Sequence, residues 1–338
     1  MRLPFPRGPV TAMLVDELSR PAHDLPPHLG EKLRGPAAAA LYDEDLQLAL
    51  YICYELHYQG FDEVDDEWEW NPSLLALRRT AEERLDQVLD KVVVRPPAVG
   101  PAELPRALAR LTAADTGPPL AAFLQRKATR EQFREFVMHR SIYHLKEADP
   151  HTWAIPRVRG RTKAALVEIQ ADEYGGGRPE RMHAELFRAT MRGLDLDDSY
   201  GAYLNAVPAI TLAVGNIMSR FGLHRGRRAA VLGHLAAFEM TSSIPNGKYS
   251  RGLRRLGGDA VARRFYDEHV QADSVHEQIA GHDLCGAFAA EQPGSAAEIL
   301  FGAACCLTLD RLFADHLLGC WRQGRSSLRA TSLEAAHR

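Results

Sequence analysis

The feature that most constrains the fold is a helical spacing of apolar residues, which recurs along the chain from residue 36 onward. Apolar side chains follow one another three or four positions apart, and this spacing places them on one face of an α-helix. Alternating runs of β-branched residues, which would indicate strands, do not recur. The sequence therefore predicts an all-α fold.

Proline and glycine divide the helical pattern into segments. The predicted helices lie at about residues 36–59, 73–93, 103–112, 129–147, 159–187, 200–221, 226–243, 258–289 and 293–322. We expect four regions: an irregular arm at residues 1–35, N-terminal helices at 36–100, a larger helical domain at 101–325, and a frayed tail at 326–338.

The composition excludes several classes of partner. The 338 residues carry a net charge of −3 and a quarter of them are charged, so we expect no nucleic acid and no anionic membrane surface as partner. The N-terminus lacks the apolar segment of a secretory signal. The longest apolar run, residues 206–223, is interrupted by polar side chains. The five cysteines show no CxxC spacing. We therefore expect a cytoplasmic protein with a small ligand.

The strongest local motif is the triplet His269, Asp273 and His276 within a predicted helix. Offsets of four and seven residues are close to whole helical turns, so the three side chains project from one stripe. Two imidazoles and a carboxylate suit iron, manganese or zinc, whereas calcium and magnesium prefer oxygen ligands. By itself the motif is equally compatible with polar residues on a solvated face.

Further acidic and imidazole side chains occur in apolar helical contexts. Glu239 is surrounded by apolar residues, where a carboxylate is costly unless it is paired or bound to metal. Glu173 and His183 flank a segment with three glycines and Pro179, which must break the helix if both bind one site. Glu147 is by itself only an acid near a helix end. A helical metal site collects such residues from several facing helices.

The ordered series of these residues resembles the metal-ligand series of the haem-oxygenase-like di-iron oxidases and oxygenases, which include bacterial iron-containing redox enzymes. The stretches FEMTSSIPNGKYSRGLRRLG and FYDEHVQADSVHEQIAGHDL carry the same resemblance, which covers about residues 35–322. Within the family, the chain is most similar to the central domain of guanidine N-oxygenases. The resemblance implies a haem-oxygenase-like helical bundle at residues 101–325, preceded by additional N-terminal helices.

The resemblance also implies the metal ligands. Six would be common to the family: Glu173, His183, Glu239, His269, Asp273 and His276. Glu147 would be a seventh, a feature associated with members that oxidise nitrogen. The cofactor implied is two iron ions.

The chemistry implied is O2 activation through a peroxo-di-iron(III) intermediate, with electrons from an external donor, because the chain shows no flavin or nicotinamide motif. The leading hypothesis is N-oxygenation of an amine, guanidine or aminoazole derived from an amino acid in specialised metabolism. Two alternatives stay open. One is C–C cleavage, desaturation or cyclisation of a free amino acid, and the other is a non-catalytic metal-binding protein.

Three further expectations concern the surroundings of the site. Tyr266 lies one turn before His269 and is a candidate catalytic residue, although helical position alone favours an ordinary buried tyrosine. The cluster Arg251, Arg254 and Arg255 is a candidate for docking a substrate carboxylate, although ordinary surface arginines are the favoured alternative. The apolar faces of the helices at residues 36–93 favour a homodimer.

Overall fold

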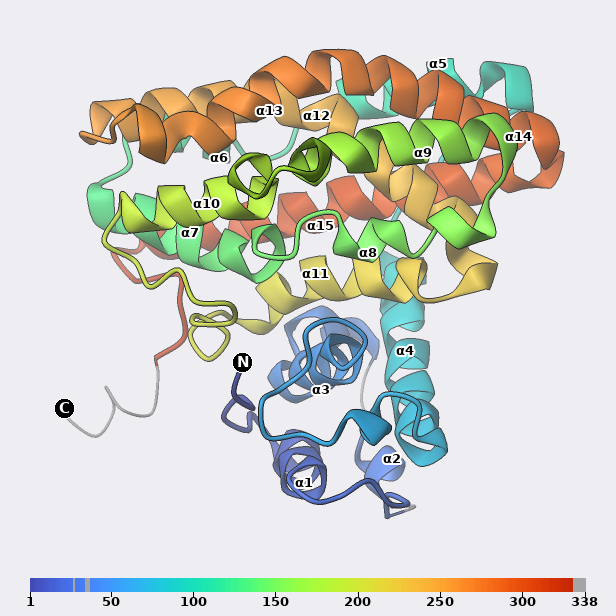
Figure 1. The fold of residues 1–338 in the computed structure, drawn as a ribbon, viewed down its shortest axis with the longest axis vertical. Coiled ribbons are helices and arrows are strands. Elements are labelled where there is room, and N and C mark those ends of the chain that lie inside the picture. Colours follow the sequence, from blue (N-terminus) through green and yellow to red (C-terminus); the bar gives the residue numbers. More distant parts are fainter. Residues whose placement is uncertain (27, 34–36, 331–338) are drawn as a thin grey trace. The chain divides into compact units, whose positions relative to one another are not determined.

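The computed structural model describes residues 1–26, 28–33 and 37–330, except for the side chains at positions 37, 38 and 272–275. All regular secondary structure in these residues is helical, as Figure 1 shows. The prediction of an all-α fold is confirmed.

The chain divides into two compact units, which are described separately. The first comprises Met1–Val92, Ser199–Ile217 and Leu328–Arg338, and the second comprises Val93–Asp198 and Met218–Ser327. The elements of the first unit are α1 (Pro9–Leu18), α2 (Leu29–Lys32), η1 (Ala37–Tyr42), α3 (Glu44–Glu55), η2 (Asp66–Trp68) and α4 (Pro72–Val92). Helix α11 (Ala209–Gly222) begins in the first unit and ends in the second.

The second unit holds the remaining helices. They are η3 (Pro101–Glu103), α5 (Leu104–Ala113), α6 (Leu120–Arg126), α7 (Arg130–His144), α8 (Asp149–Thr152), η4 (Ile155–Arg157), α9 (Gly160–Glu173), η5 (Gly175–Gly177), η6 (Pro179–Arg181), α10 (His183–Arg192), η7 (Arg225–Arg227), α12 (Arg228–Arg255), α13 (Ala260–Gln278), the π-helix η8 (Ile279–Gly286), α14 (Ala287–Glu291), η9 (Pro293–Ser295) and α15 (Ala296–Arg322). Helix α12 packs against both α13 and α15, while α13 also packs against α10 (Figure 1).

Local sequence signals explain where several helices begin. Helix α7 starts with a capping box, in which the Thr129 side chain accepts from the backbone of Gln132 and the Gln132 side chain accepts from the backbone of Thr129. Helix α3 begins at Asp43, whose carboxylate accepts from the backbone N–H of Leu46. These bonds satisfy backbone donors that a helix leaves without a partner at its first turn.

Two glycines allow α12 and α15 to cross closely. A Cβ atom at Gly233 would collide with the backbone carbonyl of Ile299, and one at Gly302 would collide with the carbonyl of Ala230. Since backbone atoms cannot move aside as a flexible side chain does, only glycine fits at these two positions. The crossing fixes α12 against the interior of the second unit.

Some predicted boundaries were wrong. The arm expected to be irregular at residues 1–35 contains helix α1, which begins with Pro9 at its first position. Helix α12 was expected to stop near residue 243, but it continues through Pro245 to Arg255. Packing against α13 compensates for the backbone hydrogen bond that proline removes. The predicted helix at 258–289 changes to a π-helix after Gln278.

The expectations of a homodimer and of a cytoplasmic location remain predictions. The apolar side chains of α3 and α4 on which the homodimer depended, such as Leu48, Ile52 and Leu85, are buried within the single chain. A dimer would therefore need another surface, and sedimentation would test it. Among the described residues, no helix is both long enough and apolar enough to cross a lipid bilayer. The cysteines are buried free thiols.

Candidate metal centre

Six of the seven predicted ligands converge inside the second unit in two groups that share one carboxylate. The first group comprises Glu147, Glu173, His183 and His269, and the second comprises Glu173, Glu239 and His276. Within each group the possible ligand atoms all lie within 4.8 Å of one another. All six side chains are buried, with at most 9% of their surface exposed. The seventh, Asp273, lies on α13, but its side chain is outside the described residues.

Glycines in the η5 segment let the chain reverse direction, which brings Glu173 and His183 together. Glu173 is the last residue of α9 and His183 is the first residue of α10. Gly175, Gly176 and Gly177 all have positive φ angles, between 61° and 77°, which glycine adopts without strain. A Cβ at Gly175 would lie 2.6 Å from the backbone of Arg181 and Met182. The break that the sequence predicted between these ligands is therefore a tight reversal of the chain.

Polar atoms of Glu173, His183 and Glu147 are buried without hydrogen bonds. Glu173 Oε2 lies 2.8 Å from His183 Nδ1, yet both atoms are buried and form no hydrogen bond. The second carboxylate oxygen of Glu147 is likewise buried without a hydrogen-bond partner. Buried polar atoms are nearly always paired. These unpaired atoms within one cluster therefore fit a bound cation that would satisfy them together.

The first group is oriented by neighbouring hydrogen bonds. The Phe265 carbonyl can only accept, so His269 Nδ1 must carry the proton in their 2.8 Å hydrogen bond. The lone pair of His269 is therefore on Nε2, which lies 3.8 Å from Glu147 Oε1. His144 Nδ1 lies 2.8 Å from that same Glu147 oxygen and holds the carboxylate from the other side. Metal-binding imidazoles and carboxylates are commonly oriented in this way.

In the second group, His276 lies between two carboxylates. Its Nδ1 is 3.1 Å from Glu239 Oε2, and its Nε2 is 2.9 Å from Asp172 Oδ2. Burial alone would lower the pKa of His276, but the hydrogen bonds to Glu239 and Asp172 raise it to about 9. Without a metal ion, a proton on this imidazole partly neutralises the surrounding carboxylates.

The first group is also strongly charged. Burial would raise the pKa of Glu147, but His144 and His269 outweigh burial and hold that pKa well below its usual range. Burial opposes protonation of His183, yet the Glu173 carboxylate raises the pKa of that imidazole. Ionised carboxylates in a buried cluster are costly unless a cation accompanies them.

The residues fit iron. Carboxylates and imidazoles without thiolates suit iron, manganese or zinc, and a set mixing oxygen with several nitrogens disfavours calcium and magnesium. The two groups meet at one carboxylate, that of Glu173.

The structure brings neither Tyr266 nor the arginine cluster into these groups. Tyr266 is buried among aromatic rings, 6.4 Å from the ring centre of Phe133 and 5.6 Å from that of Tyr249. Its hydroxyl has no hydrogen-bond partner within the described part of the chain. Arg255 donates to the carbonyls of Gln125 and Ala128, so this guanidinium stabilises the end of α6. Tyr266 remains only a candidate catalytic residue.

The sequence interpretation missed Asp172 and His144. Asp172 precedes Glu173 on α9, and its mostly exposed carboxylate reaches His276 on α13. His144 is the last residue of α7 and contacts Glu147 three positions later. The short spacing between His144 and Glu147 is a signal that the sequence does contain. No sequence pattern links Asp172 to His276, because they are far apart along the chain.

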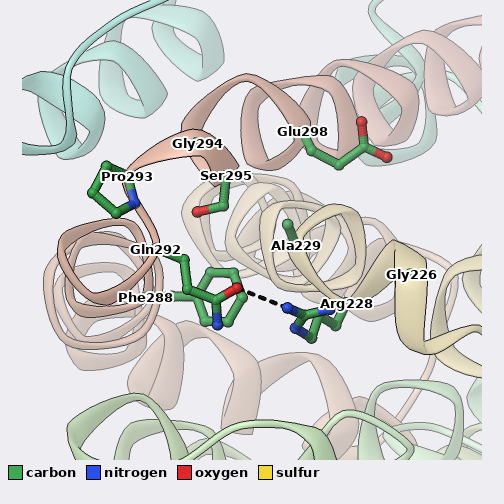
Figure 2. A pocket seen from close by; sticks show the side chains of 9 residues that line it. All are labelled: Gly226, Arg228, Ala229, Phe288, Gln292, Pro293, Gly294, Ser295 and Glu298. Carbon is green, nitrogen blue, oxygen red and sulfur yellow. Dashed lines mark hydrogen bonds between the residues drawn. The ribbon is translucent and has the colours of Figure 1, made fainter.

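A pocket of about 400 Å³ lies elsewhere in the second unit, between the starts of α12 and α15 (Figure 2). Its lining includes Phe288 and Glu298, and the Gln292 side chain accepts a hydrogen bond from Arg228 at 2.7 Å. None of its lining residues belongs to either ligand group. The pocket is therefore separate from the candidate metal centre.

Comparisons with known proteins agree with this site. A family model described as "iron-containing redox enzyme" matches residues 134–311, a range that contains all seven predicted ligands. The chain is also similar to the nitrosourea synthase of Streptomyces achromogenes subsp. streptozoticus, with 24% identity over 136 residues. That match covers 40% of this chain and 29% of the synthase. The fold, the buried cluster and the family match agree that the chain belongs to the iron-containing redox enzymes, a family with a haem-oxygenase-like helical fold.

Proposed function

We propose that the protein is a di-iron oxygenase that uses O2 to oxidise a nitrogen atom of a small, amino-acid-derived substrate. The observation that supports this proposal most directly is the pair of buried ligand groups that share Glu173. Six ligands come from these groups and Asp273 supplies a seventh. The substrate class is an amine, guanidine or aminoazole, and the electrons come from an external donor.

When bound, two iron(II) ions supply the ability to bind O2 and to reduce it by two electrons. The protein's own residues hold and tune this pair. Glu173 occupies the position shared by both groups, while His269 presents Nε2 because its Nδ1 proton is held by Phe265. His276 would hold a metal ion only after losing a proton, and the Asp172 carboxylate, 2.9 Å from its Nε2, orients the imidazole.

The preference for nitrogen over carbon oxidation depends on Glu147. Its carboxylate belongs to the first group, where it adds negative charge beside His269. When iron is bound, an additional anionic ligand at this position would favour iron(III) over iron(II). The similarity to a nitrosourea synthase supports the same preference, because a nitrosourea contains an oxidised nitrogen.

The proposal is tested in two steps. The metal-free protein is titrated with iron(II) without oxygen, and bound iron is counted by elemental analysis and Mössbauer spectroscopy. The loaded protein is then mixed rapidly with O2 and candidate amines, guanidines and amino acids, with products identified by mass spectrometry. We expect two irons per chain and products that carry one added oxygen on nitrogen. Cleaved or desaturated carbon chains would instead establish carbon oxidation, and iron binding without O2 consumption would establish a non-catalytic protein.

A further inference from the structure

A strained turn directly follows Glu147. Ala148 has φ 75° and ψ −31°, a conformation that L-residues rarely adopt, and its side chain is buried. Such conformations persist only where the surrounding structure enforces them. The turn places Glu147 toward the first ligand group and Asp149 at the start of α8.

The carbonyl of Ala148 is held from α9. The Gln170 side chain donates to this carbonyl at 2.9 Å and to the Thr152 hydroxyl at 2.5 Å. Gln170 lies three residues before Glu173 on the same helix and is itself buried. A side chain on α9, the helix that carries Glu173, therefore hydrogen-bonds to the turn that follows Glu147.

A second connection joins the same two segments from the other side of Glu173. The Tyr174 hydroxyl lies 2.8 Å from Asp149 Oδ1 and 2.8 Å from the Thr152 hydroxyl. Tyr174 follows Glu173 directly, and Asp149 lies two residues after Glu147. The two ligands are therefore tied together through hydrogen bonds to residues on both sides of Glu173.

We propose that Asp149, Thr152, Gln170 and Tyr174 form a polar clamp that sets the separation of Glu147 and Glu173 and thereby prepares the first group for metal. The inference rests on the proposed metal centre. These four are positioning residues, because their side chains bond to one another and to the Ala148 carbonyl and so act on the ligands through the neighbouring backbone. Directional hydrogen bonds fix a geometry that apolar packing of similar volume would leave looser.

The clamp is tested with Gln170→Leu and Tyr174→Phe, which remove its two arms separately. Tyr249→Phe is the matched control, because Tyr249 is a partly buried tyrosine whose ring packs against Tyr266 and Phe136. Asp149 provides a rescue pair: Asp149→Asn keeps an acceptor for Tyr174, whereas Asp149→Ala does not. For each full-length variant, anaerobic iron(II) titration, Mössbauer spectra and the unfolding temperature of the metal-free protein are measured.

We expect Gln170→Leu, Tyr174→Phe and Asp149→Ala to weaken binding of one iron by up to about 10-fold, the lower end of the loss seen when a hydrogen bond to a metal ligand itself is removed, because the clamp acts through the neighbouring backbone. The Mössbauer signal of that iron should broaden, and Asp149→Asn and Tyr249→Phe should match the wild type. Two tightly bound irons in every variant would overturn the clamp while leaving the proposed function intact. The clamp would also be overturned if iron affinity fell only in proportion to the unfolding temperature in every variant, including the Tyr249→Phe control. A wild-type protein that binds no iron would instead overturn the metal centre, and the clamp with it.

Discussion

The two ligand groups share Glu173 but are built from different parts of their helices. In the first group, Glu147 lies in the turn after α7, and His183 is the first residue of α10. In the second group, Glu239 and His276 lie inside the long helices α12 and α13. His269 of the first group also lies inside α13. The first group therefore depends partly on turns for its geometry, whereas Glu239 and His276 of the second lie on helices packed against each other.

This difference indicates how the two proposed metal positions should respond to change. Side chains inside packed helices keep their positions because many neighbouring contacts hold the backbone. Side chains at helix ends depend on a few hydrogen bonds and on the conformations of individual turn residues, such as Ala148 and Gly175. We therefore expect the second group to be the more rigid and the first to be the more easily disturbed.

The largest effect should follow Glu173→Ala, which would remove the feature common to both groups. Both irons should be lost, and turnover should fall at least about 10³-fold, because no ligand remains to join the pair. Elemental analysis after anaerobic loading and a product assay measure these losses. If this variant kept two irons, the shared position of Glu173 would be refuted.

The contributions of the two groups can be separated with one substitution in each group. Glu147→Ala should fold and retain at least one iron, while His276→Ala should lose the iron of the second group because that imidazole has no replacement. In stopped-flow mixing with O2, Glu147→Ala should form its transient visible absorption poorly or without product. A wild-type lifetime and product yield for Glu147→Ala would remove the reason for preferring nitrogen oxidation.

The rigidity of the second group can be tested at the helix crossing. Gly302→Ala introduces a methyl group against the Ala230 carbonyl on α12, and we expect it to cost about 3 kcal/mol of unfolding free energy. The displaced α12 should weaken iron binding in the second group more than in the first. Denaturant unfolding and iron titration measure the two effects, and Gly226→Ala, where a Cβ meets nothing within 4 Å, is the control.

Asp172→Ala should have a smaller effect on iron binding, confined to the second group. It removes the carboxylate that lies 2.9 Å from His276 Nε2, and we expect iron affinity in the second group to fall about 10- to 100-fold. The first group should be unaffected. Equal weakening of both irons in the titration would mean that Asp172 acts on the charge of the whole centre rather than on His276.

The last prediction concerns pH. Because the pKa of His276 is raised to about 9 in the metal-free protein, its stabilising contribution is fully present below pH about 6.5 and is lost as pH rises through about 9. Iron must displace this proton, so affinity in the second group should rise about tenfold per pH unit between those limits. Titrations at several pH values, with His276→Gln as a flatter control, measure the slope. A slope of zero would contradict protonation of His276.

The sequence by itself determined the helical class and the identity of the residues that converge. Helical periodicity is a local property, so the all-α fold follows from residue spacing alone. The offset between His269 and His276 likewise places both side chains on one face of α13, and both are in the ligand groups. A resemblance of seven ordered positions then indicated the remaining ligands, of which Asp273 lies outside the described side chains.

The tertiary structure alone decided how those residues are grouped. That Glu173 joins both groups, that Asp172 reaches His276 and that Gln170 holds the Ala148 turn all depend on contacts between segments that are distant along the chain. The positive φ of Ala148 has no signal in the sequence, since alanine normally avoids it. Helix α12 continues through Pro245 for the same reason, because packing outweighs local preference. Local spacing can show which side chains share a helix face, but distances between helices arise only when the helices pack.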